Sequence, residues 1–252
     1  MIEPHAFLLR KPKDETLLYK IIPSRYFIDM LENNYIYFRK VDTYHDDTRD
    51  GDQPDADKLI SENKKFQLHS GYTLKDYYSD ARSKTYACCF STQNTQFLWE
   101  HYSHGDKNAI CLVLDCRKLI EYINSVYMNA FLIVNNNRYK NFLFINYGLV
   151  TYGNMDQLFV KDNFLNPIEY AYFKDANKYS DEDEFRITLS CIGMFKYQLD
   201  GRPFAFPESL KLEFNIRDVI ANKILKEILI ASGHDEDLRI KLQAATNIID
   251  ES

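Results

Sequence analysis

The stretch DEDEFRITL (Asp181–Leu189) places two carboxylates one residue apart, directly before a run in which apolar and polar residues alternate. This alternation predicts a β-strand. Side chains two residues apart on a strand point to the same face, so Glu182, Glu184 and Arg186 are expected together on one face. That face either presents charge to a site or is a solvated strand end in which Arg186 bridges the two glutamates.

The rest of the chain predicts several more strands and a few helices. Further strands are expected over Thr16–Ile22, Tyr35–Phe38, Thr85–Phe90, Ala109–Asp115, Phe142–Tyr152 with a break at Gly148, Ile168–Phe173, Leu210–Ile216 and Lys226–Ala231. Helices are expected after Pro23-Ser24, over Thr95–Tyr102, after Asp115, and at the C-terminus through Leu238, Leu242, Ala245 and Ile249. No repeat or Pro/Gly/Ser-rich linker divides the chain. Residues 1–252 are therefore predicted to form a single α+β domain with mixed, mostly antiparallel sheets and peripheral helices.

Composition excludes several classes of protein. The 252 residues are 45% hydrophobic, enough for a substantial core, and the net charge of −6 argues against a general nucleic-acid coat. The five cysteines fit no metal-binding spacing, which indicates reduced thiols, and no apolar run is long enough to cross a membrane. We therefore expect a cytoplasmic protein without a membrane partner. The motifs of Rossmann enzymes, P-loop ATPases, zinc proteases and serine hydrolases are all missing.

An acidic stretch, Asp42–Asp57, contains seven aspartates and is expected to be a long surface loop. Asp46, Asp47 and Asp50 have a spacing that resembles oxygen ligands of a hard cation, although the late glutamate of a calcium loop is missing. The alternative is a solvated loop, in which Asp47 or Asp50 bonds a strand end or fixes Arg49.

Two further segments carry candidate ligand-binding residues. Trp99 and Tyr102 would share one face of a helix, where they could stack on a flat ring, or Trp99 could be a core anchor. Ser91 and Thr92 follow a buried strand, where their hydroxyls could orient a phosphate or ribose, or cap the next helix. Lys174 and Arg186 could bind a phosphate or pair with the two glutamates.

Four blocks together resemble a widespread bacterial family of domains of unknown function. They are LLYK (Leu17–Lys20), YIYFRKVDTYHDDTRDG (Tyr35–Gly51), the region CFST to VLD (Cys89–Asp115), and Lys174 with Tyr179 and EDEFR (Glu182–Arg186). The family pattern falls here on Tyr19, Asp47 with Asp50, Phe90-Ser91, Trp99 with Tyr102 and Gly105, and Glu182/Glu184/Arg186. Tyr179 stands where that family usually has Trp.

The chain also resembles ADP-ribosyltransferases of the Arg/Ser-Thr-Ser/Glu-x-Glu type. Their ordered motifs correspond to Tyr19-Lys20, to Phe90-Ser91-Thr92 and to Glu182-x-Glu184. Lys20 is the nearest base to the missing first-strand arginine, and Gln93 stands in place of the second serine. The resemblance implies an NAD-binding cleft and a related fold, with Glu184 as the catalytic carboxylate and Glu182 as its partner.

Three functions are consistent with these features. The first is an enzyme that uses NAD as a substrate and either transfers ADP-ribose to a protein or nucleic acid or hydrolyses the glycosidic bond, as in a bacterial toxin or phage-defence effector. Its ligand cleft would be lined by Tyr19, Lys20, Ser91, Thr92, Trp99, Tyr102 and Arg186. The second is a non-catalytic module that binds a ligand or a partner protein such as an antitoxin. The third is a metal-dependent nuclease that uses Asp47, Asp50 and Glu182.

Overall fold

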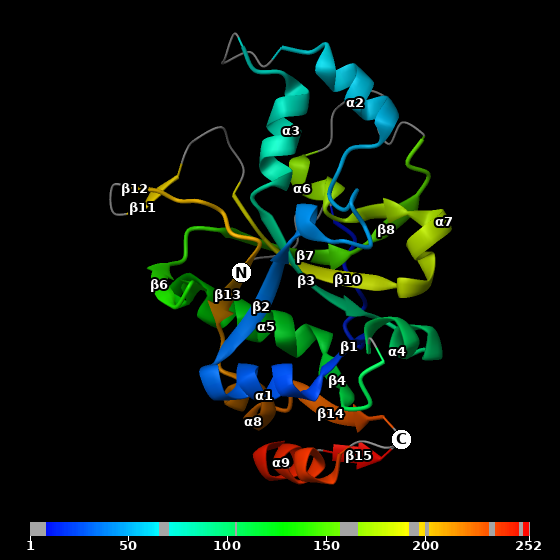
Figure 1. Ribbon diagram of the computed structural model, residues 1–252, viewed down its shortest axis with the longest axis vertical. Helices are drawn as coiled ribbons and strands as arrows, with labels where there is room; N and C mark the ends of the chain where they lie inside the picture. Colours follow the sequence, from blue (N-terminus) through cyan, green and yellow to red (C-terminus); the bar gives the residue numbers. More distant parts are fainter. Residues whose placement is uncertain are drawn as a thin grey trace.

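A large, mostly antiparallel sheet forms the centre of the computed structural model (Figure 1). The structure describes residues 9–65, 71–103, 105–156, 166–191, 197–199, 202–231, 235–246 and 249–251. The central strands follow the order β15-β14-β4-β1-β3-β2-β13-β5-β6, and β10 pairs with both β3 and β7. The α+β class and the mostly antiparallel sheet predicted from the sequence are confirmed.

The strands are short and come from all parts of the chain. They are β1 (Leu17–Pro23), β2 (Tyr35–Lys40), β3 (Thr85–Ser91), β4 (Ala109–Asp115), β5 (Phe131–Val134), β6 (Asn137–Lys140), β7 (Phe144–Leu149), β8 (Thr151–Gly153), β9 (Phe173–Asp175), β10 (Glu184–Ser190), β11 (Gln198–Leu199), β12 (Arg202–Pro203), β13 (Ser209–Glu213), β14 (Leu225–Ile230) and β15 (Ile249–Glu251). Strands β8 and β9 form a separate parallel pair, and β11 pairs with β12.

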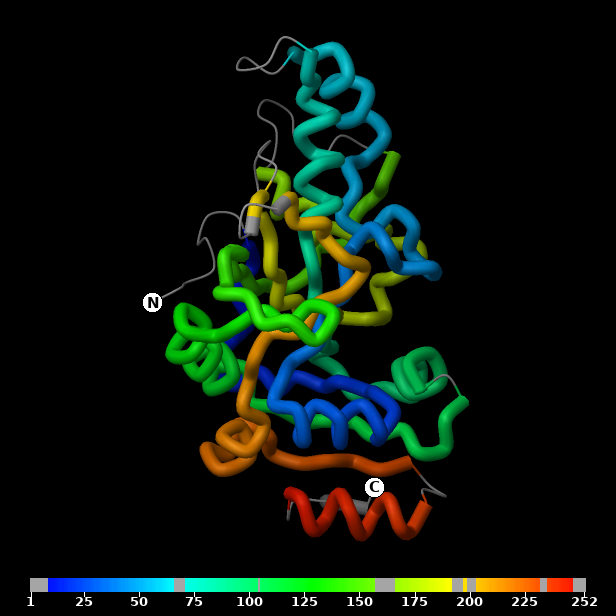
Figure 2. Tube along the Cα trace, turned by 60° about the vertical axis from the view of Figure 1, so that its left-hand side comes forward, coloured from blue at the N-terminus to red at the C-terminus, as the bar shows by residue number. Residues whose placement is uncertain are grey.

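The helices lie around the sheet. They are α1 (Ser24–Asn33), α2 (Asp55–Glu62), α3 (Leu74–Arg82), α4 (Gln96–Tyr102), α5 (Cys116–Val126), α6 (Pro167–Tyr170), α7 (Ala176–Tyr179), α8 (Ile216–Ala221) and α9 (Glu236–Thr246), with short 3-10 turns at Val41–Thr43, Tyr127–Asn129 and Ser180–Glu182. Helices α2 and α3 project from one end of the molecule, and α9 lies at the opposite end (Figure 2).

Local sequence signals explain the ends of several helices. Pro23 precedes α1, and Asn34 ends it in the left-handed conformation with φ of 51°. The side chain of Thr95 accepts a hydrogen bond from the Leu98 amide at the start of α4, and Asp115 caps α5 in the same way. The predicted helices after Pro23 and Asp115 and over Thr95–Tyr102 are therefore confirmed.

Strand β3 positions the candidate site because it has three neighbours. Strand β10 pairs with β3 along its whole length, from Glu184 opposite Ser91 to Ser190 opposite Thr85. On the other edge, β1 pairs with β3 only at Ser91, and β2 pairs with it only near Ala87. Strands β1 and β2 therefore diverge along β3 and leave the middle of that edge unpaired with either of them.

Three expectations about local structure are wrong. The segment Ile168–Phe173 is not a strand, because Asn166 and Glu169 form a capping box that starts α6 at Pro167. Ile249 belongs to β15 and not to the C-terminal helix. The break expected at Gly148 falls after Leu149, where β7 ends. Gly148 stays within β7, and a glycine suits this position because a Cβ there would meet the backbone oxygen of Arg10 at 3.2 Å.

The acidic stretch Asp42–Asp57 is also not simply a surface loop. Asp50 is only 2% exposed, Asp47 is 8% exposed, and α2 begins within the stretch at Asp55. The composition suggested solvent exposure, but a buried arginine and a buried lysine on other elements pair with these aspartates. None of the helices in the described part of the chain is long and apolar enough to span a membrane.

Candidate functional site

A cavity of about 580 Å³ opens where β1 and β2 diverge from β3. Its floor comes from β3 and β10, and the segment from Tyr44 to Asp50 and helix α4 form its walls. Lys174 of β9 and both glutamates of the DEDEFR segment also line it. The paired acids therefore face a hollow in the molecule and not a solvated strand end.

Three of the predicted site residues lie side by side across neighbouring strands. Ser91 of β3 is the register partner of Tyr19 of β1 on one edge and of Glu184 of β10 on the other. Directly opposed residues in an antiparallel pair point to the same face. Tyr19, Ser91 and Glu184 therefore form one row at the end of the cavity floor, although they come from three distant parts of the sequence.

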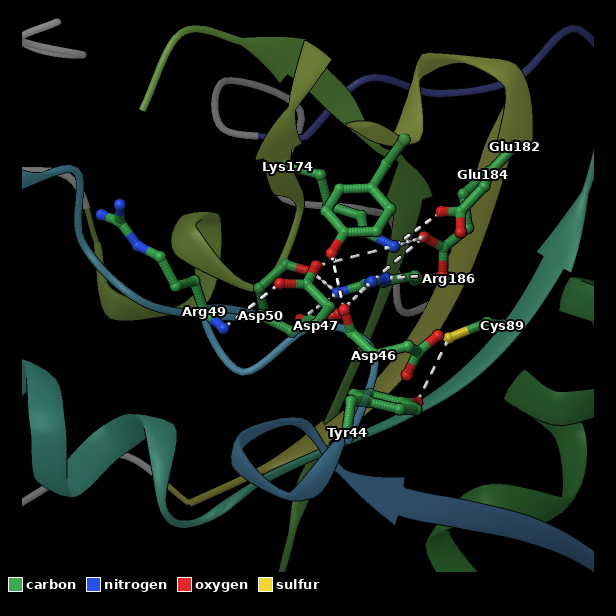
Figure 3. Close-up of polar contacts among 12 residues, drawn as sticks. Tyr44, Asp46, Asp47, Arg49, Asp50, Cys89, Lys174, Glu182, Glu184 and Arg186 are labelled. Atoms are coloured by element: carbon green, nitrogen blue, oxygen red, sulfur yellow. Dashed lines mark hydrogen bonds and ion pairs between the residues drawn. The ribbon is translucent and has the colours of Figure 1, made fainter. Parts of the chain in front are cut away.

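Arg186 is the centre of the polar network next to this row (Figure 3). Its guanidinium donates to Glu184 at 2.8 and 3.0 Å, to both carboxylate oxygens of Asp50 at 2.6 and 2.5 Å, and to the Ala171 carbonyl at 2.7 Å. These contacts use the full donor capacity of an arginine, and the side chain is only 1% exposed. Asp50 thus ties the acidic stretch to β10.

Lys174 makes the second ion-pair group of the site. Its ammonium donates to Glu182 Oε2 at 2.6 Å and lies 3.5 Å from Glu184 Oε2 and 3.8 Å from Asp47 Oδ2. Tyr102 of α4 donates its hydroxyl to the other oxygen of Glu182 at 2.6 Å. The pairing of Arg186 and Lys174 with the glutamates, one of the two alternatives from the sequence, is what the structure contains.

The two glutamates have pKa values that move in opposite directions. Burial acts to raise the pKa of Glu184, but the charges of Arg186 and Lys174 outweigh it and hold the pKa at about 2. Burial and the neighbouring charge of Glu184 together raise the pKa of Glu182, against the opposing effect of Lys174. One carboxylate is thus held ionised beside another that is easier to protonate, an arrangement that separates acid–base roles in many active sites.

The remaining predicted residues are distributed differently. Tyr102 and Lys20 line the cavity, and the Lys20 ammonium donates to the Cys89 carbonyl at 2.8 Å. Thr92 and Trp99 are not among the lining residues: Thr92 bonds the Asp183 carbonyl, and the Trp99 ring nitrogen donates to Asn94 at 2.9 Å. The half-buried Trp99 is therefore neither a wall of the cavity nor a deeply buried anchor.

Several residues of the site were missed as ligand-binding candidates. Tyr37 and Arg39 of β2 line the cavity because the sheet places β2 beside β3. Tyr44 also lines it, and its hydroxyl lies 3.5 Å from the Cys89 sulfur. Burial raises the pKa of the Cys89 thiol well above its ordinary value, so Cys89 is not an activated nucleophile. Tyr37 and Arg39 are two residues apart and so share one face of β2, but only the pairing of β2 with β3 shows that this face lines the cavity.

Within the described residues, no group of histidine, cysteine, aspartate and glutamate side chains is arranged to hold a metal ion. Of the three aspartates expected as ligands, Asp50 pairs with Arg186 and Asp47 lies near Lys174, whereas Asp46 is exposed, with its carboxylate 3.8 Å from the His101 ring. Comparison of the chain with protein-family profiles, curated proteins and solved structures gave no match. The function of this chain is therefore inferred from the geometry of the cavity.

Proposed function

We propose that the cavity binds an NAD-like dinucleotide and cleaves its N-glycosidic bond, transferring ADP-ribose to a macromolecular acceptor or to water. The observation that carries this proposal is the row of Tyr19, Ser91 and Glu184 at the cavity floor, with Glu182 adjacent and the two glutamate pKa values shifted in opposite directions. A cavity of about 580 Å³ falls in the size range of small-molecule sites.

The chemistry needs one permanently ionised carboxylate. As the bond between the ribose C1′ and the nicotinamide nitrogen breaks, the electron pair leaves with nicotinamide and positive charge develops on the sugar. Glu184 stabilises that charge because Arg186 and Lys174 keep it ionised, and its rigid hydrogen bonds remove the need for reorganisation.

Glu182 then accepts the proton of the incoming group. An acceptor hydroxyl or water forms the new bond to C1′ and gives its proton to the ionised form of Glu182. The raised pKa of Glu182 makes it a stronger base than an ordinary glutamate, and Tyr102 and Lys174 fix its two oxygens. In this proposal Ser91, which lines the cavity, orients the ribose, and the tyrosines of the cavity stack on the nicotinamide.

Release of nicotinamide from labelled NAD tests the proposal. The reaction should include bacterial protein and nucleic acid as candidate acceptors. Glu182→Gln should reduce release about 100-fold or more, the usual effect of removing a general base. Glu213→Gln should have no effect, because Glu213 ends β13 outside the cavity lining and pairs with the exposed Arg138. The absence of both nicotinamide release and modified macromolecule with the wild-type protein would overturn the proposal.

One observation favours a second function, that of a non-catalytic binding module. Both oxygens of Glu184 are occupied by Arg186, as they would be in a brace between β10 and the acidic stretch. In that case the cavity binds its ligand without turnover, and the chain acts through a partner protein such as an antitoxin. Tight NAD binding with no cleavage, unchanged by Glu182→Gln, would support this alternative. In either case, a role in toxicity or phage defence is part of the proposal.

A further inference from the structure

Two cations in the cavity have no carboxylate partner among the described residues. Lys174 and Arg186 are bound to acids on several sides, but Lys20 and Arg39 form no ion pair within the described part of the chain, although both line the same cavity. A half-buried cation that faces a cavity attracts anions more strongly than one in bulk water. These two residues are therefore the candidates for holding a negatively charged part of a ligand.

The two cations differ in how much of their hydrogen-bonding capacity is free. The Lys20 ammonium donates to the Cys89 carbonyl at 2.8 Å and lies 5.0 Å from the centre of the Phe90 ring, so it is held against β3. Arg39 donates through Nη2 to the Thr43 carbonyl at 2.8 Å and weakly through Nε to the Thr43 hydroxyl at 3.5 Å. Its Nη1 group has no hydrogen-bond partner among the described residues.

Arg39 also lies on the same face of the sheet as the row of Tyr19, Ser91 and Glu184, at the opposite end of the cavity floor. It is the register partner of Ala87, whereas Glu184 is the partner of Ser91, four residues further along β3. Opposed residues share a face, so the Arg39 side chain and the glutamate row belong to the same side of the sheet. At a strand rise of about 3.4 Å per residue, the four residues from Ala87 to Ser91 separate the two ends by about 14 Å.

We propose that Arg39 binds the phosphate or diphosphate group of the ligand, and that the ligand is therefore a nucleoside diphosphate derivative with its reacting sugar at the glutamate end. A guanidinium suits this role because its planar fork can donate to two phosphate oxygens at once. The assignment of the reacting end rests on the proposed function, whereas the anion subsite stands on the geometry of Arg39 alone.

Direct binding measurements test the subsite without requiring turnover. Calorimetric titrations of the full chain with inorganic pyrophosphate, ADP and adenosine would be made on wild type, Arg39→Gln and Arg39→Lys. Arg49→Gln is the matched control, because Arg49 pairs with Asp55 and is outside the cavity lining. Thermal unfolding of each variant checks that it folds.

The expected result is that Arg39→Gln weakens ADP and pyrophosphate binding by about 10- to 100-fold, as for loss of a charge-assisted contact. Adenosine binding should not change, Arg39→Lys should restore part of the affinity, and Arg49→Gln should behave like wild type. ADP that binds no tighter than adenosine, or equal pyrophosphate affinity in folded Arg39→Gln and wild type, would overturn the subsite. Arg39-dependent binding without NAD cleavage would refute the proposed reaction but leave the subsite intact.

Discussion

Replacing Arg186 by methionine should be among the most damaging single changes in this protein. The substitution keeps a long apolar side chain but removes five hydrogen bonds, two to Glu184, two to Asp50 and one to the Ala171 carbonyl. Asp50 is 2% exposed and Glu184 is 6% exposed, so both carboxylates would lose their main cation while remaining buried. Breaking a buried ion pair from one side costs about 3–5 kcal/mol.

This cost is large compared with the whole stability of a domain, which is about 5–15 kcal/mol. Urea unfolding followed by circular dichroism would measure it as a lower midpoint at an unchanged slope. Arg138→Met is the matched control, because Arg138 pairs with Glu213 at 2.7 Å on the surface and both side chains are more than a third exposed. That pair should contribute about 0–1 kcal/mol.

Two outcomes would refute this reasoning. A loss of less than about 1 kcal/mol for Arg186→Met would mean that the buried carboxylates find water or other partners. An equal loss for Arg138→Met would mean that burial does not distinguish the two arginines. Either result would remove the physical basis for treating Glu184 as a rigidly held, ionised group.

Three further predictions follow from the same site. The folded-state pKa of Glu184 is about 2, below its ordinary value of 4.5, so the stability that its ionisation contributes is present above about pH 4.5 and is lost as the pH falls toward 2. Acid unfolding should show this loss in a Glu182→Gln background, which removes the opposing contribution of Glu182. Adding Glu184→Gln should flatten the pH dependence. Tyr102→Phe removes the hydroxyl that donates to Glu182, so nicotinamide release should fall about 10-fold with an unchanged circular dichroism spectrum; unchanged release would exclude a role for this contact. Iodoacetamide at neutral pH should label Cys89 only after denaturant is added, because burial raises the pKa of its thiol. Rapid labelling of Cys89 in the native protein, detected by mass spectrometry, would contradict this.

Alternation and capping signals predicted most of the strands and helices correctly. The run AICLVLD (Ala109–Asp115) became the buried strand β4, and the helix expected over Thr95–Tyr102 formed as α4, although Thr95 caps it and not Ser91 or Thr92. The Ile168–Phe173 prediction failed because the capping box lies just before that run, at Asn166. Apolar content alone does not distinguish a short buried helix from a strand.

The site was predictable only in part. Strand parity correctly placed Glu184 and Arg186 on one face of β10, but Glu182 belongs to the 3-10 turn Ser180–Glu182 before that strand and joins the group through Lys174. The order of the motifs suggested that Tyr19 and Ser91 join them at a cleft. The burial of Asp50 could not be predicted, because a cluster of aspartates is normally solvated and only the fold brings Arg186 to it. Arg39 was missed for a similar reason, since its place depends on how β2 pairs with β3.

Glu184→Gln alone does not separate catalysis from a structural brace, because Glu184 supports the buried Arg186. The most direct measurement is a crystal structure with a non-cleavable NAD analogue. We predict that C1′ of the nicotinamide ribose lies against the carboxylates of Glu182 and Glu184, with a diphosphate oxygen within hydrogen-bonding distance of Arg39. An analogue that binds outside this cavity, or that lies in it with its diphosphate against the glutamates, would contradict the account.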